Sequence, residues 1–566
     1  MTPTRRIRLV LALGAAMATA FPAHSAGDDV AGAYLAARQA ARDNDYAAAG
    51  TYYAQALVQD PSNQAFMEGA IFGLLASGRL EDGIPVARRL VSSGGRAQPA
   101  LIVLLADQVK RGDFGQVLDD LEAGRNIGPL LDGLTRAWGA LGDGRMSEAL
   151  EAFDVLAEAP GMQPFGHYHK AVALAAVGDF EGADALFSEY DDGFVRTRRG
   201  AFAHAQILSQ LERNEDALAR LEDLFGSDTD PELDHLRGLL EAGGGVPFDI
   251  ARDAAEGMAE AFFTIAAALQ GEAADNQTLL YARTAAWLRP GHADAVLLAA
   301  GMLEAQGQHE LAGAAYATIP EDSPSHLAAA QGRAQSMFAA GHKDEAVALM
   351  QALSEHYPDM LSVHVGLGDF QRQTERYEEA AAAYSRAIAL IDTPENRHWP
   401  LFYSRAIAWE RAKMWDEAEP DFRKALELNP EQPSVLNYLG YSLLDMNRNL
   451  DEAMGMIERA VAQRPDDGYI TDSLAWGYFM LGRYDEAVEP MEKAAQLLPV
   501  DPIVTDHLGD VYWAVGRILE ARFQWKRALS FEPEPDEAVR IRRKLEVGLD
   551  RVLEEEGESA LSERGQ

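Results

Sequence analysis

Cysteine is absent from the 566 residues of this chain. Its absence excludes disulfide bonds, metal sites built on thiolates and a cysteine nucleophile. It also excludes a lipoprotein, because attachment of the lipid needs a cysteine at the cleavage site. The sequence therefore cannot carry out functions that depend on cysteine chemistry.

Basic residues are also scarce. Lysine and arginine together number 50 against 89 aspartates and glutamates, which gives a net charge of −39 at pH 7. Nucleic acid and anionic lipid surfaces are poor partners for such a chain, since affinity for phosphate groups needs positive charge. Two explanations remain for the acidity, namely solubility and the steering of basic partners towards the protein.

The usual signatures of chemistry are missing as well. The sequence has no phosphate-binding glycine loop, no His-Glu-x-x-His zinc motif and no Gly-x-Ser-x-Gly nucleophile motif. His167 and His169 are two residues apart, so on a helix they would point to different faces and lack a third ligand. The sequence predicts no enzyme, no cofactor and no metal site.

The first residues have the pattern of an export signal. Three arginines precede a short apolar run over residues 9–21, and small residues follow. The run is shorter than the roughly 20 apolar residues that cross a membrane, which predicts a signal peptide over residues 1–25, cleaved near Ser25 or Ala26. We expect a periplasmic protein with no integral membrane segment after cleavage. The alternative is an uncleaved membrane anchor.

What the chain has in abundance is an internal repeat. A period of 34 or 35 residues indicates stacked helix–turn–helix units, each burying its apolar face against its neighbours. A small residue at the helix crossing, a large apolar residue one turn later and a proline after the second helix resemble the tetratricopeptide repeat. The sequence predicts an all-α solenoid of about 12–14 such repeats, closed by a C-terminal capping helix. The recurring residues are Ala425, Ala460, Ala494 and Ala528, with Pro430, Pro465, Pro499 and Pro533.

The pattern divides the chain into blocks. Degenerate repeats occupy residues 26–225, and the glycine-rich composition of residues 226–248 predicts a loop-rich joint. Further repeats extend over residues 249–533, followed by a capping helix at 534–556 whose apolar seam would cover the last exposed face. We expect the tail, residues 557–566, to be disordered. The sequence leaves open whether the blocks form one superhelix or two.

Binding residues are expected on the first helix of each repeat, because these helices line the inner surface of such a superhelix. Asn437, Asp472 and Asp506 occupy equivalent places in successive repeats and predict a polar ladder that binds the backbone of an extended segment. Neighbouring aromatic faces would supply contact area. The alternative is that the aromatic side chains only fill gaps between packed helices. The candidate partner-binding residues are Tyr403, Asn437, Tyr441, Tyr469, Asp472, Trp476, Phe479, Asp506, Asp510 and Trp513.

The chemistry of this ladder indicates the kind of partner. Tetratricopeptide domains that hold the terminal carboxylate of a chaperone use lysines and arginines at these inner positions. The ladder in this chain is acidic or neutral. A protein partner that offers amides, lysines or arginines therefore fits better than a carboxylate.

The last repeats resemble one group of proteins more specifically. Residues 436–444 (LNYLGYSLL), 466–477 (DDGYITDSLAWG) and 506–510 (DHLGD) are similar to exported bacterial tetratricopeptide proteins. That group includes the outer-membrane lipoprotein partner of the periplasmic carboxy-terminal processing protease. The resemblance implies a non-enzymatic adaptor that binds an envelope protease and presents substrates such as cell-wall hydrolases to it. The chain departs from that lipoprotein in having no lipid-accepting cysteine. The alternative function is a module of envelope polysaccharide export or assembly that binds glycan or export components, since aromatic rows also stack on sugar rings.

Overall fold

The computed structural model describes residues 26–190, 196–226, 231–557 and 561. Within these residues the regular structure consists of helices, with no strand, which confirms the predicted all-α repeat fold. None of the described helices is long and apolar enough to cross a membrane. The predicted signal peptide, residues 1–25, lies outside the described residues.

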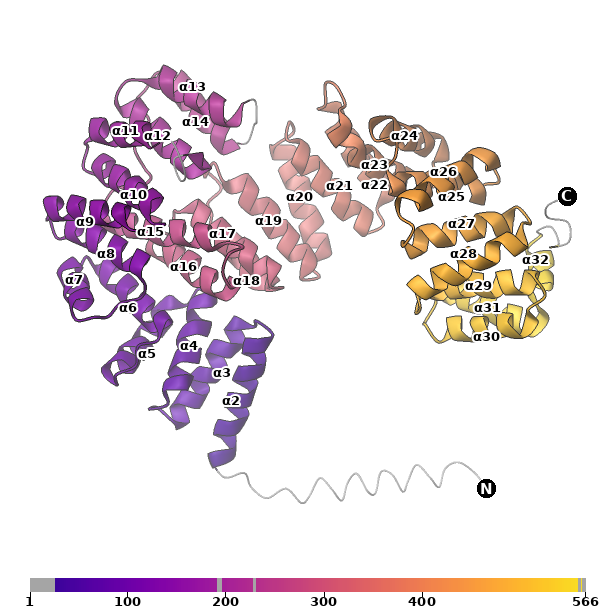
Figure 1. The fold of residues 1–566 in the computed structure, drawn as a ribbon, viewed down its shortest axis with the longest axis horizontal. Coiled ribbons are helices and arrows are strands. Elements are labelled where there is room, and N and C mark those ends of the chain that lie inside the picture. Colours follow the sequence, from indigo (N-terminus) through magenta and orange to yellow (C-terminus); the bar gives the residue numbers. More distant parts are fainter. Residues whose placement is uncertain (1–25, 191–195, 227–230, 558–560, 562–566) are drawn as a thin grey trace. The chain divides into compact units, whose positions relative to one another are not determined.

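Contacts within the chain divide it into two compact units, Met1–Leu349 and Met350–Gln566. We call them unit 1 and unit 2 and describe each by itself (Figure 1). The division falls inside the block 249–533 that the repeat pattern predicts as continuous. The loop-rich joint predicted at 226–248 is wrong in its middle, because Pro231–Glu241 form helix α14. Leucines at helical spacing give this segment a buried apolar face, which the glycines on either side obscured.

Unit 1 is built from helices that pack in pairs. Its helices are α2 (Ala26–Arg42), α3 (Tyr46–Gln59), α4 (Gln64–Ala76), α5 (Leu80–Ser92), α6 (Gln98–Arg111), α7 (Phe114–Glu122), α8 (Pro129–Gly142), α9 (Met146–Glu158), α10 (Gln163–Ala176), α11 (Phe180–Glu189), α12 (Arg198–Gln210), α13 (Asn214–Phe225), α14, α15 (Ala254–Leu269), α16 (Asp275–Leu288), α17 (Ala293–Ala305), α18 (His309–Tyr316) and α19 (His326–Ala339). Helix α20 (Lys343–His356) contains the point of division between the units.

Unit 2 continues the same pairing. Its helices are α21 (Leu361–Gln373), α22 (Tyr377–Ala389), the short 3-10 helix η2 (Asn396–His398), α23 (Trp399–Arg411), α24 (Trp415–Leu428), α25 (Pro433–Asp445), α26 (Leu450–Gln463), α27 (Gly468–Met480), α28 (Tyr484–Leu497), α29 (Pro502–Ala514), α30 (Ile518–Leu529), α31 (Pro535–Val547) and α32 (Leu549–Glu556).

Small residues lie where the two helices of a pair cross. Ala487 on α28 and Ala521 on α30 are fully buried at these crossings. One turn later, Met491 and Trp525 fill the space beside them and are also fully buried. Close packing of this kind leaves little room for a change of volume. The structural role predicted for these repeat positions is therefore confirmed.

The turn between the helices of a pair requires one residue with a left-handed backbone. Gly482 and Gly516 supply it in the last two regular pairs, with φ of 72° and 79°. Glycine adopts this conformation at no steric cost. Glu375 and Lys413 adopt it at φ of 61° and 64° in earlier pairs, where a side chain costs about 1 kcal/mol. The geometry of the repeat thus imposes the turn even on residues that disfavour it.

Helices α15 and α16 fold back onto the first helices of the preceding repeats in unit 1. Helix α15 packs on α6, α8 and α10, and α16 packs on α4 and α6 (Figure 1). This arrangement joins residues far apart in the sequence: Nε2 of Gln98 on α6 donates to the Tyr281 hydroxyl on α16 over 3.0 Å. The inner surface of the N-terminal repeats is therefore covered by the chain itself.

The end of unit 2 is capped by two helices rather than the single helix predicted at 534–556. Helices α31 and α32 meet at Gly548, which has a left-handed φ of 88°. A Cβ atom there would lie 2.5 Å from Cζ2 of Trp513, so glycine is required by backbone and space alike. Of the tail predicted to be disordered, Leu561 is buried, and its carbonyl accepts a hydrogen bond from Tyr484. Except for Gly557 and Leu561, that tail lies outside the described residues.

Candidate functional site

The first helices of successive repeats in unit 2 form a groove, which we call the unit 2 groove. Four of the ten candidate residues line it: Asn437 and Tyr441 from α25, and Tyr469 and Asp472 from α27. The other lining residues are Glu410, Arg411, Trp415, Tyr438, Ser442, Asp445, Met446, Ser473, Ile503 and His507.

Helix geometry explains why these side chains meet. Asn437 and Tyr441 are four residues apart on α25, and Tyr469 and Asp472 are three apart on α27, so each pair shares one helix face. The Asp467 side chain accepts from the backbone N–H groups of Tyr469 and Ile470 and fixes the start of α27. The groove is thus built on regular helices with a defined beginning.

Two side chains in the groove remain available to a partner. Oδ1 of Asn437 is buried and has no hydrogen-bond partner among the described residues. Leaving such an atom unpaired costs about 1–3 kcal/mol, which a donor on a bound segment would recover. The Tyr469 side chain is 60% exposed, and its hydroxyl donates to Asp501 over 3.2 Å. A hydrogen-bond acceptor and an aromatic face thus lie in one groove.

Asp472 is held in place by a histidine. Nδ1 of His507 lies 3.1 Å from both carboxylate oxygens of Asp472. The His507 ring stacks on Trp476, with ring centroids 3.9 Å apart. Burial disfavours protonation of His507, but the Asp472 carboxylate overcomes this effect and raises the pKa of the imidazole above its ordinary value.

The electrostatic character of the groove is acidic. Glu410, Asp445 and Asp472 contribute carboxylates, and Arg411 contributes a positive charge. Burial, together with the charges of Asp472 and Asp445, raises the pKa of Tyr441 to about 12, so this hydroxyl remains a hydrogen-bond donor at neutral pH. A cationic or amide-bearing segment suits this lining better than an anion does.

Three predicted aromatic residues lie outside the groove. Phe479 is 1% exposed and stacks on the half-buried Trp476, and neither residue is among those that line the groove. Tyr403 packs against Phe422 and Tyr438, with both centroid distances at 6.0 Å. These side chains fill the gaps between packed helices, as the alternative interpretation of the aromatic row states. Their assignment as partner contacts stays a prediction.

The capping helices cover Asp506, the third residue of the predicted polar ladder. Nζ of Lys544 on α31 is fully buried and lies 2.6 Å from both Asp506 and Asp510. Nε1 of Trp525 donates to Asp510 over 2.8 Å, and Nε1 of Trp513 donates to Asp550 on α32 over 2.7 Å. Asp506, Asp510 and Trp513 therefore bind the capping helices, and their assignment to a partner-binding surface is corrected.

The sequence does contain a sign that the capping helices cover Asp506 and Asp510, and it lies one repeat further along the chain. Arg540 and Lys544 stand 34 residues after Asp506 and Asp510, at the equivalent positions of the next helix. A cation at that spacing indicates pairing between stacked helices rather than an open acidic face. The prediction also omitted Asp445 and His507 from the site. Asp445 lies one helical turn after Tyr441, and His507 lies on the repeat after that of Asp472.

The inner surface of unit 1 holds a segment of the chain itself. Residues 246–250 run along α12 and bond to its side chains: Ser209 accepts from the N–H of Val246, and Gln210 donates to its carbonyl over 2.6 Å. Gln206 accepts from the N–H of Asp249. Side chains of a first helix thus hold an extended backbone here, as they would hold a bound peptide.

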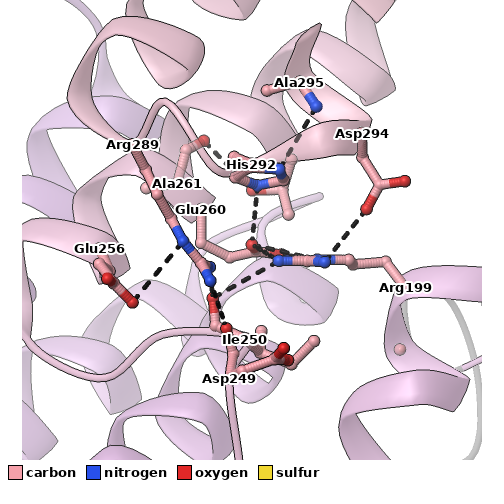
Figure 2. Close-up of polar contacts among 12 residues, drawn as sticks. Arg199, Asp249, Ile250, Glu256, Glu260, Ala261, Arg289, His292, Asp294 and Ala295 are labelled. Carbon is pink, nitrogen blue, oxygen red and sulfur yellow. Dashed lines mark hydrogen bonds and ion pairs between the residues drawn. The ribbon is translucent and has the colours of Figure 1, made fainter. Parts of the chain in front are cut away.

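A buried ionic network fixes this arrangement (Figure 2). Glu260 of α15 is fully buried and accepts hydrogen bonds from Arg199 of α12, the Tyr168 hydroxyl of α10 and Nε2 of His292. Arg199 also pairs with Asp294 over 3.1 Å. Although burial opposes ionisation, these donors hold the pKa of Glu260 well below its usual range. A buried carboxylate so paired is costly to disrupt, which ties α15 permanently to the inner surface.

Arg289 and His292 complete the network. The Arg289 guanidinium donates to the carbonyls of Asp249 and Ile250, each over 2.7 Å (Figure 2). Nδ1 of His292 accepts from the N–H of Ala295, which leaves the proton on Nε2 for donation to Glu260. Burial lowers the pKa of His292, consistent with a neutral ring. The segment 246–250 is therefore clamped from both sides.

No part of the described structure offers a metal centre. Within residues 26–190, 196–226, 231–557 and 561, no group of three or more histidine, aspartate or glutamate side chains is placed to hold a metal ion. His169 is instead fully buried between Trp138, which donates to its Nδ1, and the Thr264 hydroxyl. Its role is structural.

Sequence comparisons agree with the repeat geometry. Residues 332–394, 407–468 and 447–502 match the family model of the tetratricopeptide repeat. The TPR repeat-containing protein PA4667 of Pseudomonas aeruginosa is 26% identical over 147 residues, which is 26% of this chain and 24% of that protein. The mitochondrial import receptor subunit TOM70 of Mus musculus is 32% identical over 107 residues, which is 19% of this chain and 17% of the receptor. The matches thus span about a quarter or less of these relatives.

Two solved structures align with this chain at low similarity. The Cut9–Hcn1 hetero-tetramer of the APC/C contains a chain that is 15% identical, with 91% of this chain and 96% of that chain covered and a TM-score of 0.37. YrrB, described as a TPR protein with an unusual peptide-binding site, is 18% identical, with 34% and 97% covered and a TM-score of 0.27. Three stretches of this chain, residues 332–394, 407–468 and 447–502, are therefore shown to match the tetratricopeptide repeat.

Proposed function

We propose that this tetratricopeptide repeat protein is a non-enzymatic scaffold of the periplasm that holds an extended protein segment in the unit 2 groove. The proposal rests on the contrast between two inner surfaces. That of the N-terminal repeats is filled by α15, α16 and residues 246–250. The unit 2 groove is lined by aromatic and polar side chains and stays open. Repeat arrays bind partners along such concave surfaces.

The lining favours a segment that carries a lysine or an arginine. Its ammonium or guanidinium group would lie near Asp472 and Asp445, and a backbone N–H of the segment would donate to Oδ1 of Asn437. Charge-assisted hydrogen bonds of this kind are roughly twice as strong as neutral ones. The exposed face of Tyr469 supplies contact area at little conformational cost.

Presentation of substrates to an envelope protease is the finer form of this proposal. It rests on the resemblance of residues 436–444, 466–477 and 506–510 to exported scaffolds of that kind. The periplasmic location rests on the export signal predicted at residues 1–25. A scaffold with one open groove would hold the substrate there and contact the protease through another surface.

Photo-crosslinking in intact cells tests the proposal. A benzoylphenylalanine residue replaces Tyr469 in the groove, and the same residue replaces Tyr52, which is 37% exposed in unit 1, as the matched control. We expect a processing protease or cell-wall hydrolases among the species linked at Tyr469 and absent from those linked at Tyr52. The same species from both positions would contradict a specific site in the groove.

A binding assay tests the chemistry of the partner. Two pools of labelled decapeptides, one with lysine and one with glutamate fixed at the central position, serve as probes in fluorescence anisotropy. We expect the lysine pool to bind about tenfold more tightly, corresponding to 1.4 kcal/mol. Asp472→Asn removes that preference, whereas Asp416→Asn, an exposed carboxylate outside the groove, leaves it. Equal binding of both pools would exclude recognition of a cation.

Glycan binding is the second candidate function. The observation in its favour is the exposed ring of Tyr469, which lines the groove together with the exposed Ile503, since a sugar ring stacks on such a face. Soluble peptidoglycan strands serve as the probe in the same assay. Binding of these strands that Tyr469→Ala abolishes, without binding of either peptide pool, would replace the protein-binding proposal.

A further inference from the structure

The outer face of α30 departs from the pattern of the repeats before it. Two positions of this face carry Leu519 and Phe523, which are 82% and 64% exposed. In the three repeats before α30, the equivalent positions carry aspartate at the first and proline, glycine or glutamate at the second. They are Asp416, Asp451 and Asp485, and Pro420, Gly455 and Glu489. An exposed apolar pair in the last repeat, at positions where the earlier repeats carry aspartate and then proline, glycine or glutamate, suits a contact surface.

The charged residues beside this apolar pair are complementary to the same residues on a second copy of the helix. Glu520 precedes Phe523 by three residues, and Lys526 follows it by three. If two copies of α30 lie antiparallel about a two-fold axis at Phe523, Glu520 of each helix stands opposite the partner's Lys526. An isologous interface requires this kind of self-complementarity, in which each residue meets its counterpart twice.

The remaining basic groups of the helix are engaged within the protomer. Arg522 donates to the carbonyl of Leu545, and Arg527 donates to that of Pro499. Lys526 is exposed and makes no ion pair within the part of the chain that the structure describes. Glu520 is reached by Arg517 over 3.2 Å and keeps half of its surface open to solvent. Lys526 can therefore form a contact across an interface, and Glu520, although it is bonded to Arg517, keeps exposed surface for such a contact.

We propose that the outer face of α30 binds a second copy of this chain, with the two α30 helices antiparallel about Phe523. An anionic membrane does not fit the same face, because the chain carries a net charge of −39 and would be repelled. The contact is small, so we expect a dissociation constant in the micromolar range. It leaves the unit 2 groove of each copy open, and a partner with two binding segments would bind both grooves with higher avidity.

Sedimentation equilibrium of the chain from Ala26 onward tests the proposal. We expect a monomer–dimer equilibrium between about 1 and about 100 μM. The double variant Leu519→Asp/Phe523→Glu installs the residues found one repeat earlier and should weaken the dimer at least about tenfold without lowering the melting temperature. Val155→Asp, which changes a residue 63% exposed in unit 1, is the matched control and should leave the dimer intact.

Charge exchange tests the two-fold arrangement itself. Glu520→Lys and Lys526→Glu should each weaken the dimer, because each places like charges opposite one another twice. The combined variant E520K/K526E restores opposite charges and should restore the dimer. A monomer at every concentration, or a dimer that persists in the Leu519→Asp/Phe523→Glu variant, would overturn the proposal. A combined variant that stays monomeric would also overturn it.

Discussion

Gly257 of α15 and Trp138 of α8 depend on one another: a Cβ atom at Gly257 would lie 2.3 Å from Cε3 of the indole. Trp138 is fully buried and donates to His169, so it cannot move aside without losing that hydrogen bond. The absence of one side chain on α15 thus makes room for the largest side chain of the N-terminal repeats. This contact seats α15 on the inner surface of unit 1.

Substitution at this contact should be destabilising. We expect Gly257→Ala to lower the free energy of unfolding by about 1–3 kcal/mol, since extra volume in a packed core forces side chains off their preferred rotamers. Urea unfolding measures the effect. Gly238→Ala in α14 is the control: nothing lies within 4 Å of its added Cβ, so it should gain up to about 1 kcal/mol of helix propensity. Equal effects of the two substitutions would contradict the seating role of Gly257.

Unit 1 should lose stability on mild acidification. Burial lowers the pKa of His169 to about 4, against 6.5 in the unfolded chain. As the pH falls below 6.5 the unfolded state takes up the proton first, so the stability present above that pH is lost progressively down to about pH 4. For His169 alone the loss at pH 5 is about 2 kcal/mol.

The variant His169→Gln isolates this contribution. Glutamine can still donate and accept hydrogen bonds but does not titrate, so the difference in unfolding free energy between pH 7.5 and pH 5 should shrink by about 2 kcal/mol. His235→Gln, at an exposed position of α14, should keep the full difference. The same pH dependence in both variants would rule out His169 as the titrating group.

The cap of unit 2 should depend on Lys544. Lys544→Met removes the cation shared by Asp506 and Asp510 and leaves only Arg540, 3.8 Å from Asp510, so we expect a loss of about 3–5 kcal/mol in unfolding free energy. Arg542→Met on the same helix removes an exposed cation and should cost little. If neutralising both carboxylates to asparagine in the Lys544→Met background fails to recover stability, uncompensated charge is not the cause.

The pKa of His507 should report on the floor of the unit 2 groove. Because Asp472 raises that pKa, Asp472→Asn should lower it, and the imidazole will titrate at a lower pH. NMR titration of the ring resonances measures the shift. Asp445→Asn is the control, since Asp445 lies on the groove but makes no hydrogen bond to His507 among the described residues. An unchanged pKa in Asp472→Asn would contradict the pairing.

The repeat itself was predictable because its signals are local. Alanine at the helix crossing and a large residue one turn later, as at Ala521 and Trp525, define the pairing of adjacent helices, and the structure confirms it. The same spacing does not say which face of α15 meets α8, or that Glu260 meets Arg199. Those contacts join helices that are not neighbours in the repeat, and a periodic pattern contains no information about them.

The candidate site was predictable only in part, for a related reason. Asn437, Tyr441, Tyr469 and Asp472 line the groove because repeat geometry places them on the inner face. Asp506 and Asp510 satisfy the same rule but are covered by α31, which follows the last regular repeat. An inner-face position indicates an open surface only when another helix of the chain does not stack upon it.

The self-filled interior of unit 1 changes how such a protein can be assembled and how it can evolve. A solenoid with contacts only between neighbours can nucleate anywhere and can gain or lose repeats at its ends. Glu260 instead joins Tyr168 and Arg199, which lie 92 and 61 residues earlier. Closing such loops costs entropy before the contacts form, which slows folding. The repeats that contain α4, α6, α8 and α10 must therefore wait for α15 and α16 before they are complete, and deleting one of them would leave a partner on α15 or α16 unmatched. Unit 1 is built from solenoid repeats, but these repeats can no longer be gained or lost independently of one another.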